Sequence, residues 1–370
     1  MDPSPFILDG GLATELEASG FQLQVGTYYH TDLLSTITSL ITLVLYLQGD
    51  PLWSARILHA NPQAIKDVHY RYLQSGSDVI TTATYQASIE GFVKYLDLRP
   101  EEAQQMIMSG VQLAKETVRE FMSSTVSENR REPVVAGSVG PYGAFLHDGS
   151  EYTGAYEEKM TVEELKDWHR PQIQCLVKAG ADLVAMETIP GLKEAEALVE
   201  VLREFPEVKA WLSFSCKVTD TLHYMLCYLM ANFIHKTLAT VYAHELDIAI
   251  NAVRVFQDIH NISSGRRFSE AVQVACRSSQ LVAVGVNCCP APLVKPLLES
   301  AKSHKKADLG WVVYPNSGEE WDPKTGWKTK KQTSFAKLSL DWKDQGALWI
   351  GGCCRVGPAD ITELKEQLHV

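Results

Sequence analysis

Short apolar runs alternate with longer amphipathic stretches along most of the chain. The apolar runs cover residues 5–8, 78–83, 133–138, 181–186, 210–215, 281–286, 309–314 and 347–350. Their length and their β-branched residues are typical of buried strands. Amphipathic stretches, which predict helices, cover residues 12–18, 62–74, 101–121, 161–179, 192–205, 268–276, 291–302, 334–343 and 359–368. Strands that alternate with helices in this way indicate parallel β-α units.

Eight such units favour a closed (β/α)8 TIM barrel over an open doubly wound sheet. The placement of unusual polar residues supports the barrel, because these residues lie directly after apolar runs. That position corresponds to the carboxyl ends of the strands, where barrels carry their active sites. We therefore expect one α/β barrel domain over residues 1–370.

Two segments do not follow this alternation. Residues 35–49 are apolar-rich and uncharged up to Gly49, and residues 218–263 separate the fifth predicted strand from the next helix. Their uncharged runs are shorter than the roughly 20 apolar residues that cross a membrane. We expect both segments to be atypical insertions in the barrel.

Retained introns are an alternative origin for these two segments. Lys217 and Val218 can be encoded by AAG-GTN, which resembles a splice donor. Gln48 and Gly49 can be encoded by CAG-GGN, which resembles an acceptor. Either origin leaves the predicted fold class unchanged.

Composition limits the classes of binding partner and the cellular location that we expect. The formal net charge of −11 argues against nucleic acid and against an anionic membrane surface as partners. The chain has eight cysteines, but the first residues contain neither a basic segment nor a long apolar one. Because such a sequence does not resemble a secreted disulfide framework, we expect a cytoplasmic location.

Cysteines follow two of the predicted strands. Cys288 follows one of them, and Cys353 and Cys354 follow another. Catalytic zinc usually has three protein ligands and one open position, and thiolates are good zinc ligands, so these residues are candidate metal ligands. The alternative is that they pack as small apolar side chains. Cys289 is less suited to the same site, because adjacent side chains of a strand point to opposite faces.

Two carboxylates also occupy strand ends. Asp9 follows the first predicted strand and is succeeded by Gly10, and Glu187 follows the fourth. In these positions the carboxylates could bind an ammonium group. Capping of a helix or simple surface exposure explains them equally well from the residues alone.

Seven motifs occur in the order found in one enzyme family. They are residues 9–11 (DGG), 81–88 (TTATYQAS), 137–143 (GSVGPYG), 187–190 (ETIP), 285–288 (GVNC), 314–319 (YPNSGE) and 351–354 (GGCC). Together they resemble the homocysteine S-methyltransferase family, most closely its S-methylmethionine-using branch in plants and bacteria. The resemblance implies zinc on Cys288, Cys353 and Cys354. It also implies that Glu187 and the Asp9–Gly10 turn hold homocysteine. The chain departs from the family at the two insertions and at Cys289.

The implied reaction moves a methyl group from a sulfonium donor, S-methylmethionine or S-adenosylmethionine, to homocysteine and gives methionine. The resemblance implies no catalytic group beyond the metal-activated thiol of the substrate. The partners that it implies are small molecules. Tyr85, Tyr142 and Trp53 are candidates to face the cationic donor. Alternatives are a selenocysteine methyltransferase and a barrel that the insertions have inactivated.

Overall fold

The computed structural model describes residues 4–21, 50–124, 130–216, 260–318, 320–322, 326–328 and 335–368. The predicted insertion at residues 35–49 lies outside these ranges. Of the predicted insertion at residues 218–263, only residues 260–263 are described. Within the described ranges, no helix is both long enough and apolar enough to cross a membrane.

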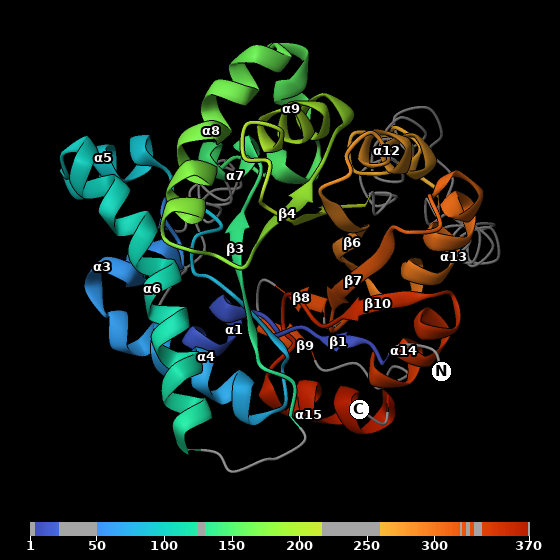
Figure 1. Cartoon of the computed structure of the whole chain (residues 1–370), viewed down its shortest axis with the longest axis horizontal. Coiled ribbons are helices and arrows are strands. Elements are labelled where there is room, and N and C mark those ends of the chain that lie inside the picture. The colour runs from blue at the N-terminus through green and yellow to red at the C-terminus, as the bar shows by residue number, and fades with distance from the viewer. Residues whose placement is uncertain are drawn as a thin grey trace, which may run out of the picture.

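A parallel eight-stranded sheet forms the centre of the molecule (Figure 1). Its strands follow the order β1-β10-β7-β6-β5-β4-β3-β2, and a parallel bridge between Leu8 and Val79 joins the two edges. The (β/α)8 barrel prediction is therefore confirmed. The strands are β1 (Phe6–Ile7), β2 (Val79–Thr81), β3 (Val134–Val139), β4 (Leu183–Ile189), β5 (Ala210–Phe214), β6 (Leu281–Pro290), β7 (Gly310–Asn316) and β10 (Ala347–Ile350).

Helices surround the sheet and link successive strands. They are α1 (Leu12–Ala18), α3 (Ala55–Ala60), α4 (Pro62–Gln74), α5 (Ile89–Leu96), α6 (Pro100–Ser124), α7 (Tyr142–Leu146), α8 (Val162–Lys178), α9 (Leu192–Leu202), α12 (Phe268–Ala275), α13 (Ala291–Ala301), α14 (Phe335–Asp344) and α15 (Pro358–Leu368). The long ones agree with the amphipathic stretches. Thr161 and Glu164 form a reciprocal capping box that begins α8. The sequence pattern did not predict the short helices α3, α5 and α7.

Large and small side chains share the inside of the barrel. Trp211 and Tyr314 lie with their ring centroids 6.1 Å apart, and Ala136, Ala185 and Ala283 belong to the same buried cluster. The indole nitrogen of Trp211 donates to the hydroxyl of Tyr314 at 3.1 Å. The packed interior therefore positions the Tyr314 hydroxyl at the carboxyl end of β7.

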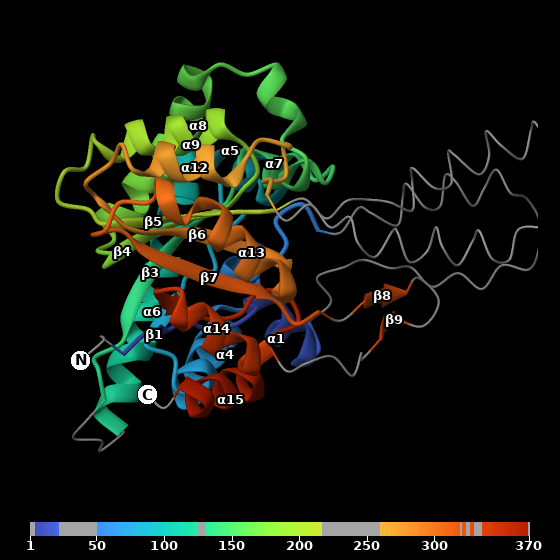
Figure 2. The ribbon, with the colours of Figure 1, turned by 90° about the vertical axis from the view of Figure 1, so that its right-hand side faces the viewer.

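The polar stretch after β7 contains a feature that the sequence pattern did not predict. Strands β8 (Glu320–Asp322) and β9 (Gly326–Lys328) pair antiparallel with each other. Figure 2 shows this hairpin beyond the end of β7, standing away from the barrel. Its three-residue strands are too short to give a clear alternation of polar and apolar positions.

Candidate metal and substrate site

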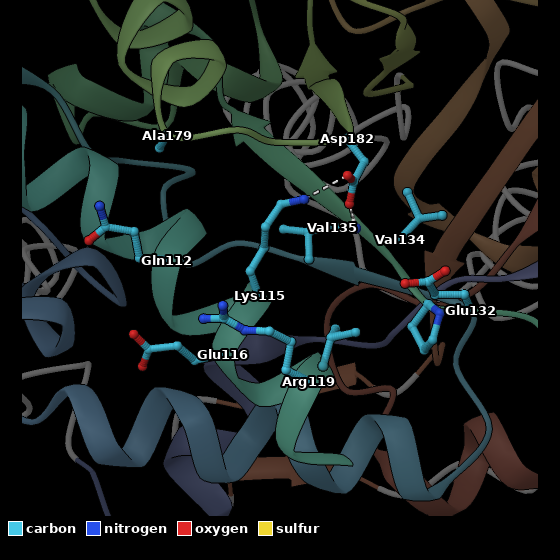
Figure 3. Close-up of a pocket in the computed structure, with 11 residues that line it drawn as sticks. Gln112, Lys115, Glu116, Arg119, Glu132, Val134, Val135, Ala179 and Asp182 are labelled. Atoms are coloured by element: carbon cyan, nitrogen blue, oxygen red, sulfur yellow. Dashed lines mark hydrogen bonds and ion pairs between the residues drawn. The ribbon is translucent and has the colours of Figure 1, made fainter. Parts of the chain in front are cut away.

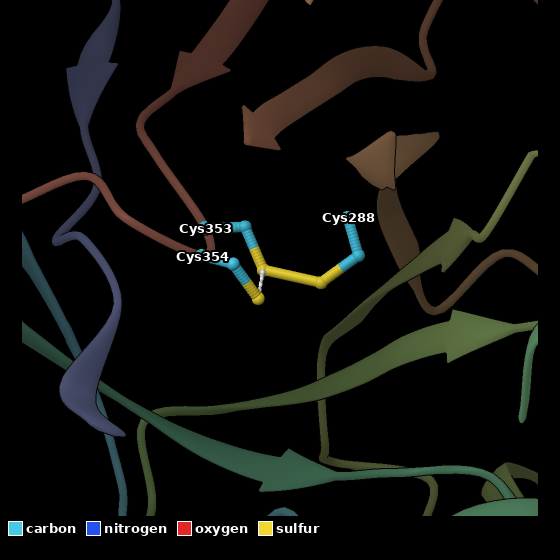
Figure 4. A group of neighbouring side chains, drawn as sticks. All are labelled: Cys288, Cys353 and Cys354. Carbon is cyan, nitrogen blue, oxygen red and sulfur yellow. Dashed lines mark hydrogen bonds between the residues drawn. A yellow bond between two sulfur atoms is a disulfide. The ribbon is translucent and has the colours of Figure 1, made fainter. Parts of the chain in front are cut away.

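Three cysteine sulfurs meet at the carboxyl end of the barrel. Cys288 lies on β6, and Cys353 and Cys354 follow β10. Their Sγ atoms all lie within 4.8 Å of one another (Figure 4). A close backbone approach makes this possible, since a Cβ on Gly351 would lie 2.4 Å from the Cβ of Leu8. The glycine is therefore required where β10 passes the end of β1.

Hydrogen bonds hold the backbone that carries the two adjacent cysteines. The amide of Cys353 donates to the carbonyl of Pro315 at 2.8 Å, and the amide of Cys354 donates to Oδ1 of Asn316 at 3.1 Å. The amide of Gly352 donates to the carbonyl of Asp9 at 3.1 Å. Residues 351–354, the cysteine turn, are thus bonded to β7 on one side and to the end of the first strand on the other.

The structure joins Cys288 and Cys353 by a disulfide with a Cα–Cα distance of 5.6 Å, and the Sγ of Cys354 lies 4.0 Å from that of Cys353. A metal would require all three cysteines as thiolates, so the metal-binding form is the reduced one. Three soft sulfur donors that converge on one point fit zinc. All three residues are partly exposed, so a fourth ligand can reach them. Burial raises the pKa of the Cys354 thiol to about 11, which a bound cation would oppose.

Cys289 points away from this group. Its side chain is fully buried in the main hydrophobic core, whereas that of Cys288 is partly exposed. The two adjacent residues therefore lie in different surroundings, and of the two only Cys288 contributes a sulfur to the group.

Asp9 is a buried carboxyl group at the end of the first strand. Thr81 donates to it twice, from the backbone amide at 2.7 Å and from Oγ1 at 2.9 Å. Burial nevertheless raises the pKa of Asp9 to about 7, and the charge of Glu187 adds to the increase. The next residue has no room for a side chain, because a Cβ on Gly10 would lie 2.3 Å from the carbonyl oxygen of Val356.

Glu187 is the second buried carboxyl group of the site. It lies on β4 with 8% of its surface exposed, and Oγ of Ser138 donates to its Oε1. Tyr314 is its second hydrogen-bond partner. Burial raises the pKa of Glu187 to about 7. The charge of Glu187 also raises the pKa of Asp9 and that of Cys354, so the carboxyl groups and the thiols lie within electrostatic reach of one another.

Ser138, Tyr314, Thr188 and Asn287 are functional candidates to which the sequence reasoning assigned no role. Ser138 and Tyr314 contact Glu187, and Asn287 forms two hydrogen bonds with Thr188. All four are polar residues in the last part of an apolar strand. The same signal singled out Asp9 and Glu187, and it could have found these residues too.

The aromatic candidates occupy two different surroundings. Trp53 and Tyr85 are partly buried and meet edge to face, with their ring centroids 6.4 Å apart. Tyr142 instead packs against Trp168 of α8 at 4.9 Å and against Tyr156 at 5.4 Å. Its ring therefore has a packing role beside α8.

A surface cavity lies at the amino ends of β3 and β4 (Figure 3). Side chains of α6 line one wall, and the starts of β3 and β4 line the other. Across it, Lys115 forms an ion pair with Asp182 at 2.7 Å. Because this cavity adjoins the amino ends of the strands, it is separate from the three cysteines and the two buried carboxyl groups.

The family model described as homocysteine S-methyltransferase matches residues 6–368. The chain belongs to the homocysteine S-methyltransferase family. It is 36% identical over 368 residues to the homocysteine S-methyltransferase YbgG of Bacillus subtilis, covering 98% of this chain and 95% of that protein. It is 37% identical over 330 residues to a betaine-homocysteine S-methyltransferase of Drosophila melanogaster, covering 86% of this chain and 88% of that protein.

Other members of the homocysteine S-methyltransferase family extend the comparison. A selenocysteine Se-methyltransferase of Brassica oleracea is 34% identical over 374 residues, with 98% of this chain and 88% of that protein covered. The homocysteine methyltransferase MmuM of Escherichia coli has been solved in a metallated form, with a TM-score of 0.70 and 31% identity. Its oxidized form gives a TM-score of 0.71 and 32% identity. Each MmuM comparison covers 99% of this chain and 96% of the other. The chain is thus a methyltransferase of this family, whose substrates are small molecules.

Proposed function

We propose that this protein transfers a methyl group from a sulfonium donor, S-methylmethionine or S-adenosylmethionine, to homocysteine and releases methionine. The proposal rests on one observation above all. Three cysteine sulfurs converge beside two buried carboxyl groups, in a chain of the homocysteine S-methyltransferase family.

Cys288, Cys353 and Cys354 would hold a zinc ion. A free thiol has a pKa of about 8.5 and is mostly protonated at neutral pH. A zinc ion bound there would supply Lewis acidity that lowers the pKa of an incoming thiol. The three cysteines must be reduced for this role, which agrees with the cytoplasmic location we propose.

Glu187 would bind the ammonium group of homocysteine, and the Asp9–Gly10 turn would complete the substrate site. Both carboxyl groups are buried without a basic partner among the described residues. An ammonium group would offset the cost of their ionisation and lower their pKa values. The binding of a cationic amine is therefore coupled to the loss of protons from these acids.

The transfer step balances without any further reactant. The sulfur of homocysteine, after losing its proton to solvent, attacks the methyl carbon of the donor in line. A new sulfur–carbon bond forms, the old one breaks, and its electron pair stays on the leaving sulfur as a neutral thioether. The main contribution of the chain is to hold both sulfurs in line. Trp53 and Tyr85 could stabilise the positive charge of the donor.

Two relatives favour further candidates. The Drosophila relative is named for betaine, which carries its methyl groups on a quaternary nitrogen cation. The Brassica relative is named for selenocysteine, in which selenium replaces the nucleophilic sulfur. Both reactions keep the same division between a nucleophile and a cationic methyl donor.

The decisive experiment uses the full chain purified with a reductant. Zinc content is measured, and methyl transfer is assayed with each donor and each acceptor in turn. We expect one zinc per chain and the fastest transfer from S-methylmethionine to homocysteine. Faster transfer from betaine or to selenocysteine would replace the substrate assignment. A folded, zinc-free protein without transfer would instead indicate an inactive barrel.

A further inference from the structure

Two strands each carry an extra residue where they reach the site. The register of β4 against β5 shifts between Met186 and Ile189, and that of β6 against β7 shifts between Asn287 and Pro290. In both cases three steps along one strand match two steps along its partner. Such β-bulges redirect side chains and are common beside active sites. Here they contain Glu187 and Cys288.

Each bulge holds its backbone in an unfavourable conformation. The φ angle is +62° at Thr188 and +48° at Cys288. Residues other than glycine avoid this left-handed region, and β-branched residues avoid it most strongly. A backbone of this kind persists only where its surroundings fix it.

The side chain of Asn287 ties the two bulges together. Its Oδ1 accepts a hydrogen bond from the amide of Thr188 at 2.8 Å, and its Nδ2 donates to Oγ1 of Thr188 at 2.7 Å. Both residues are buried, with 0% of Asn287 and 1% of Thr188 exposed. The amide of Thr188 can only donate, so the orientation of the Asn287 amide is fixed. This pair of bonds reaches past β5, which separates β4 from β6 in the sheet.

We infer that Asn287 is a positioning residue that sets Glu187 and Cys288 relative to each other. Thr188 directly follows Glu187, and Asn287 directly precedes Cys288. A change in the amide pair would therefore move the proposed amine-binding carboxylate and the proposed zinc ligand together. This inference rests on the proposed function, and it predicts that zinc affinity and homocysteine binding fall together.

The main test replaces Asn287 by alanine in the full chain under reducing conditions. Zinc affinity is measured by competition with a chromophoric chelator, and KM for homocysteine is measured separately. Groups that orient metal ligands typically change metal affinity by about 10- to 100-fold, so we expect at least a tenfold loss for Asn287→Ala. We expect KM to rise as well, because Thr188 loses one bond to its backbone amide and one to its hydroxyl.

Gln280 offers a matched control at the other end of the same strand. It precedes β6, is buried, and donates from Nε2 to the carbonyls of Leu202 at 2.9 Å and Phe205 at 2.8 Å. Gln280→Ala also removes a buried amide, but far from the site. We expect it to lower Tm while zinc affinity and KM stay within about twofold of the parent protein.

Thr188→Val provides a second variant in case Asn287→Ala does not fold. Valine keeps the β-branch and the backbone amide but removes the hydroxyl, which accepts the Nδ2 bond and also bonds to the side chain of Tyr85. We expect Thr188→Val to weaken both zinc binding and homocysteine binding, as Asn287→Ala does. Thr188→Ser keeps the hydroxyl and should retain both. A double-mutant cycle between positions 188 and 287 should show non-additive losses.

Two results would overturn the inference. One is unchanged zinc affinity and KM in the folded Asn287 or Thr188 variants. The other is an equal loss in Gln280→Ala, which would mean a general effect on stability. A parent protein that neither binds zinc nor transfers methyl groups would instead refute the proposed function.

Discussion

Acidic side chains at the two ends of the barrel differ in burial and in ion pairing. At the amino ends of the strands, Asp182 is partly exposed and pairs with Lys115 at 2.7 Å. At the carboxyl ends, Asp9 and Glu187 are buried and bonded to hydroxyl and amide groups. Within the described ranges, neither of these two carboxyl groups forms an ion pair with a basic side chain.

This difference distinguishes a carboxylate that is already paired within the fold from carboxyl groups that are available to a cationic ligand. An exposed ion pair is already satisfied and contributes little, typically about 0–1 kcal/mol. Buried acids with raised pKa values beside a thiol cluster favour the arrival of positive charge. A metal ion and an ammonium group would both supply it, so the carboxyl end is suited to two cationic partners.

Loss of a cysteine should have the largest effect on the carboxyl end of the barrel. Cys288→Ser, Cys353→Ser and Cys354→Ser should each lower zinc affinity by at least about a hundredfold, because each ligand contributes several kcal/mol to binding. Methyl transfer should disappear in all three. Metal analysis after gel filtration provides the measurement, and the partly exposed Cys276→Ser is the control. Full zinc retention in all three variants would exclude them as ligands.

Neutralising Glu187 should give the next largest effect. Glu187→Gln keeps hydrogen-bonding partners for Ser138 and Tyr314 but removes the charge that would bind an ammonium group. A charge-assisted bond contributes about 1.5–3 kcal/mol, so KM for homocysteine should rise roughly 10- to 150-fold while zinc stays bound.

Lys115→Met is the matched change at the amino end. It breaks the exposed ion pair with Asp182 and should alter the free energy of unfolding by less than about 1 kcal/mol. Glu187→Gln and Lys115→Met are compared by steady-state kinetics and by chemical denaturation. Equal KM values for Glu187→Gln and the parent protein would remove Glu187 from the substrate site.

The pH dependence of methyl transfer should reflect the two buried carboxyl groups. Burial raises the pKa of Asp9 and of Glu187 to about 7, so both are largely protonated below that pH in the free protein. Protonated acids bind an ammonium group poorly, so kcat/KM should fall by up to about tenfold per unit as the pH decreases below 7. A profile that is equally steep in Glu187→Gln would assign the decrease to another group.

Stability of the metal-free protein should change in the opposite direction. Both carboxyl groups have lower pKa values when unfolded, near 3.8 and 4.5, so the folded state binds more protons between pH 4 and 7. The free energy of unfolding should therefore decrease as the pH rises through this range. Denaturation at several pH values measures it, and Glu187→Gln should reduce the slope.

Removal of residues 218–259 should have the smallest effect. An antiparallel bridge pairs Cys216 with Ile262, so the two sides of this segment already lie together. Ile262 is fully buried, and the amide of Ser263 donates to the carbonyl of Ser215 at 2.9 Å. Because a shorter connection lowers the entropic cost of closure, the deletion should leave stability and zinc binding equal or slightly higher. Loss of folding would show that the segment is a native part of the barrel.

The sequence predicted the barrel because each strand is short, apolar and followed by an amphipathic helix. It also predicted which strand ends carry polar groups. It did not predict that β4 and β6 continue to Ile189 and Pro290, since a bulge interrupts the alternation on which strand prediction depends. The contact between Asn287 and Thr188 was equally hidden, because it joins residues far apart in the chain. Whether Cys288 binds zinc or forms a disulfide with Cys353 depends on redox conditions, which no residue pattern encodes.

The contact between the first and last units of the barrel also bears on the order of folding. The amide of Gly11 donates to the carbonyl of Val356, and the amide of Arg355 donates to Oγ1 of Thr14, across 341 positions of sequence. Contacts between such distant residues form slowly, because a long loop must close before they can. We therefore expect the cysteine turn beside Asp9 to be among the last parts of the barrel to assemble. During synthesis the growing chain should acquire its helices and inner strands first, and its metal-binding ability only when the final strand has docked.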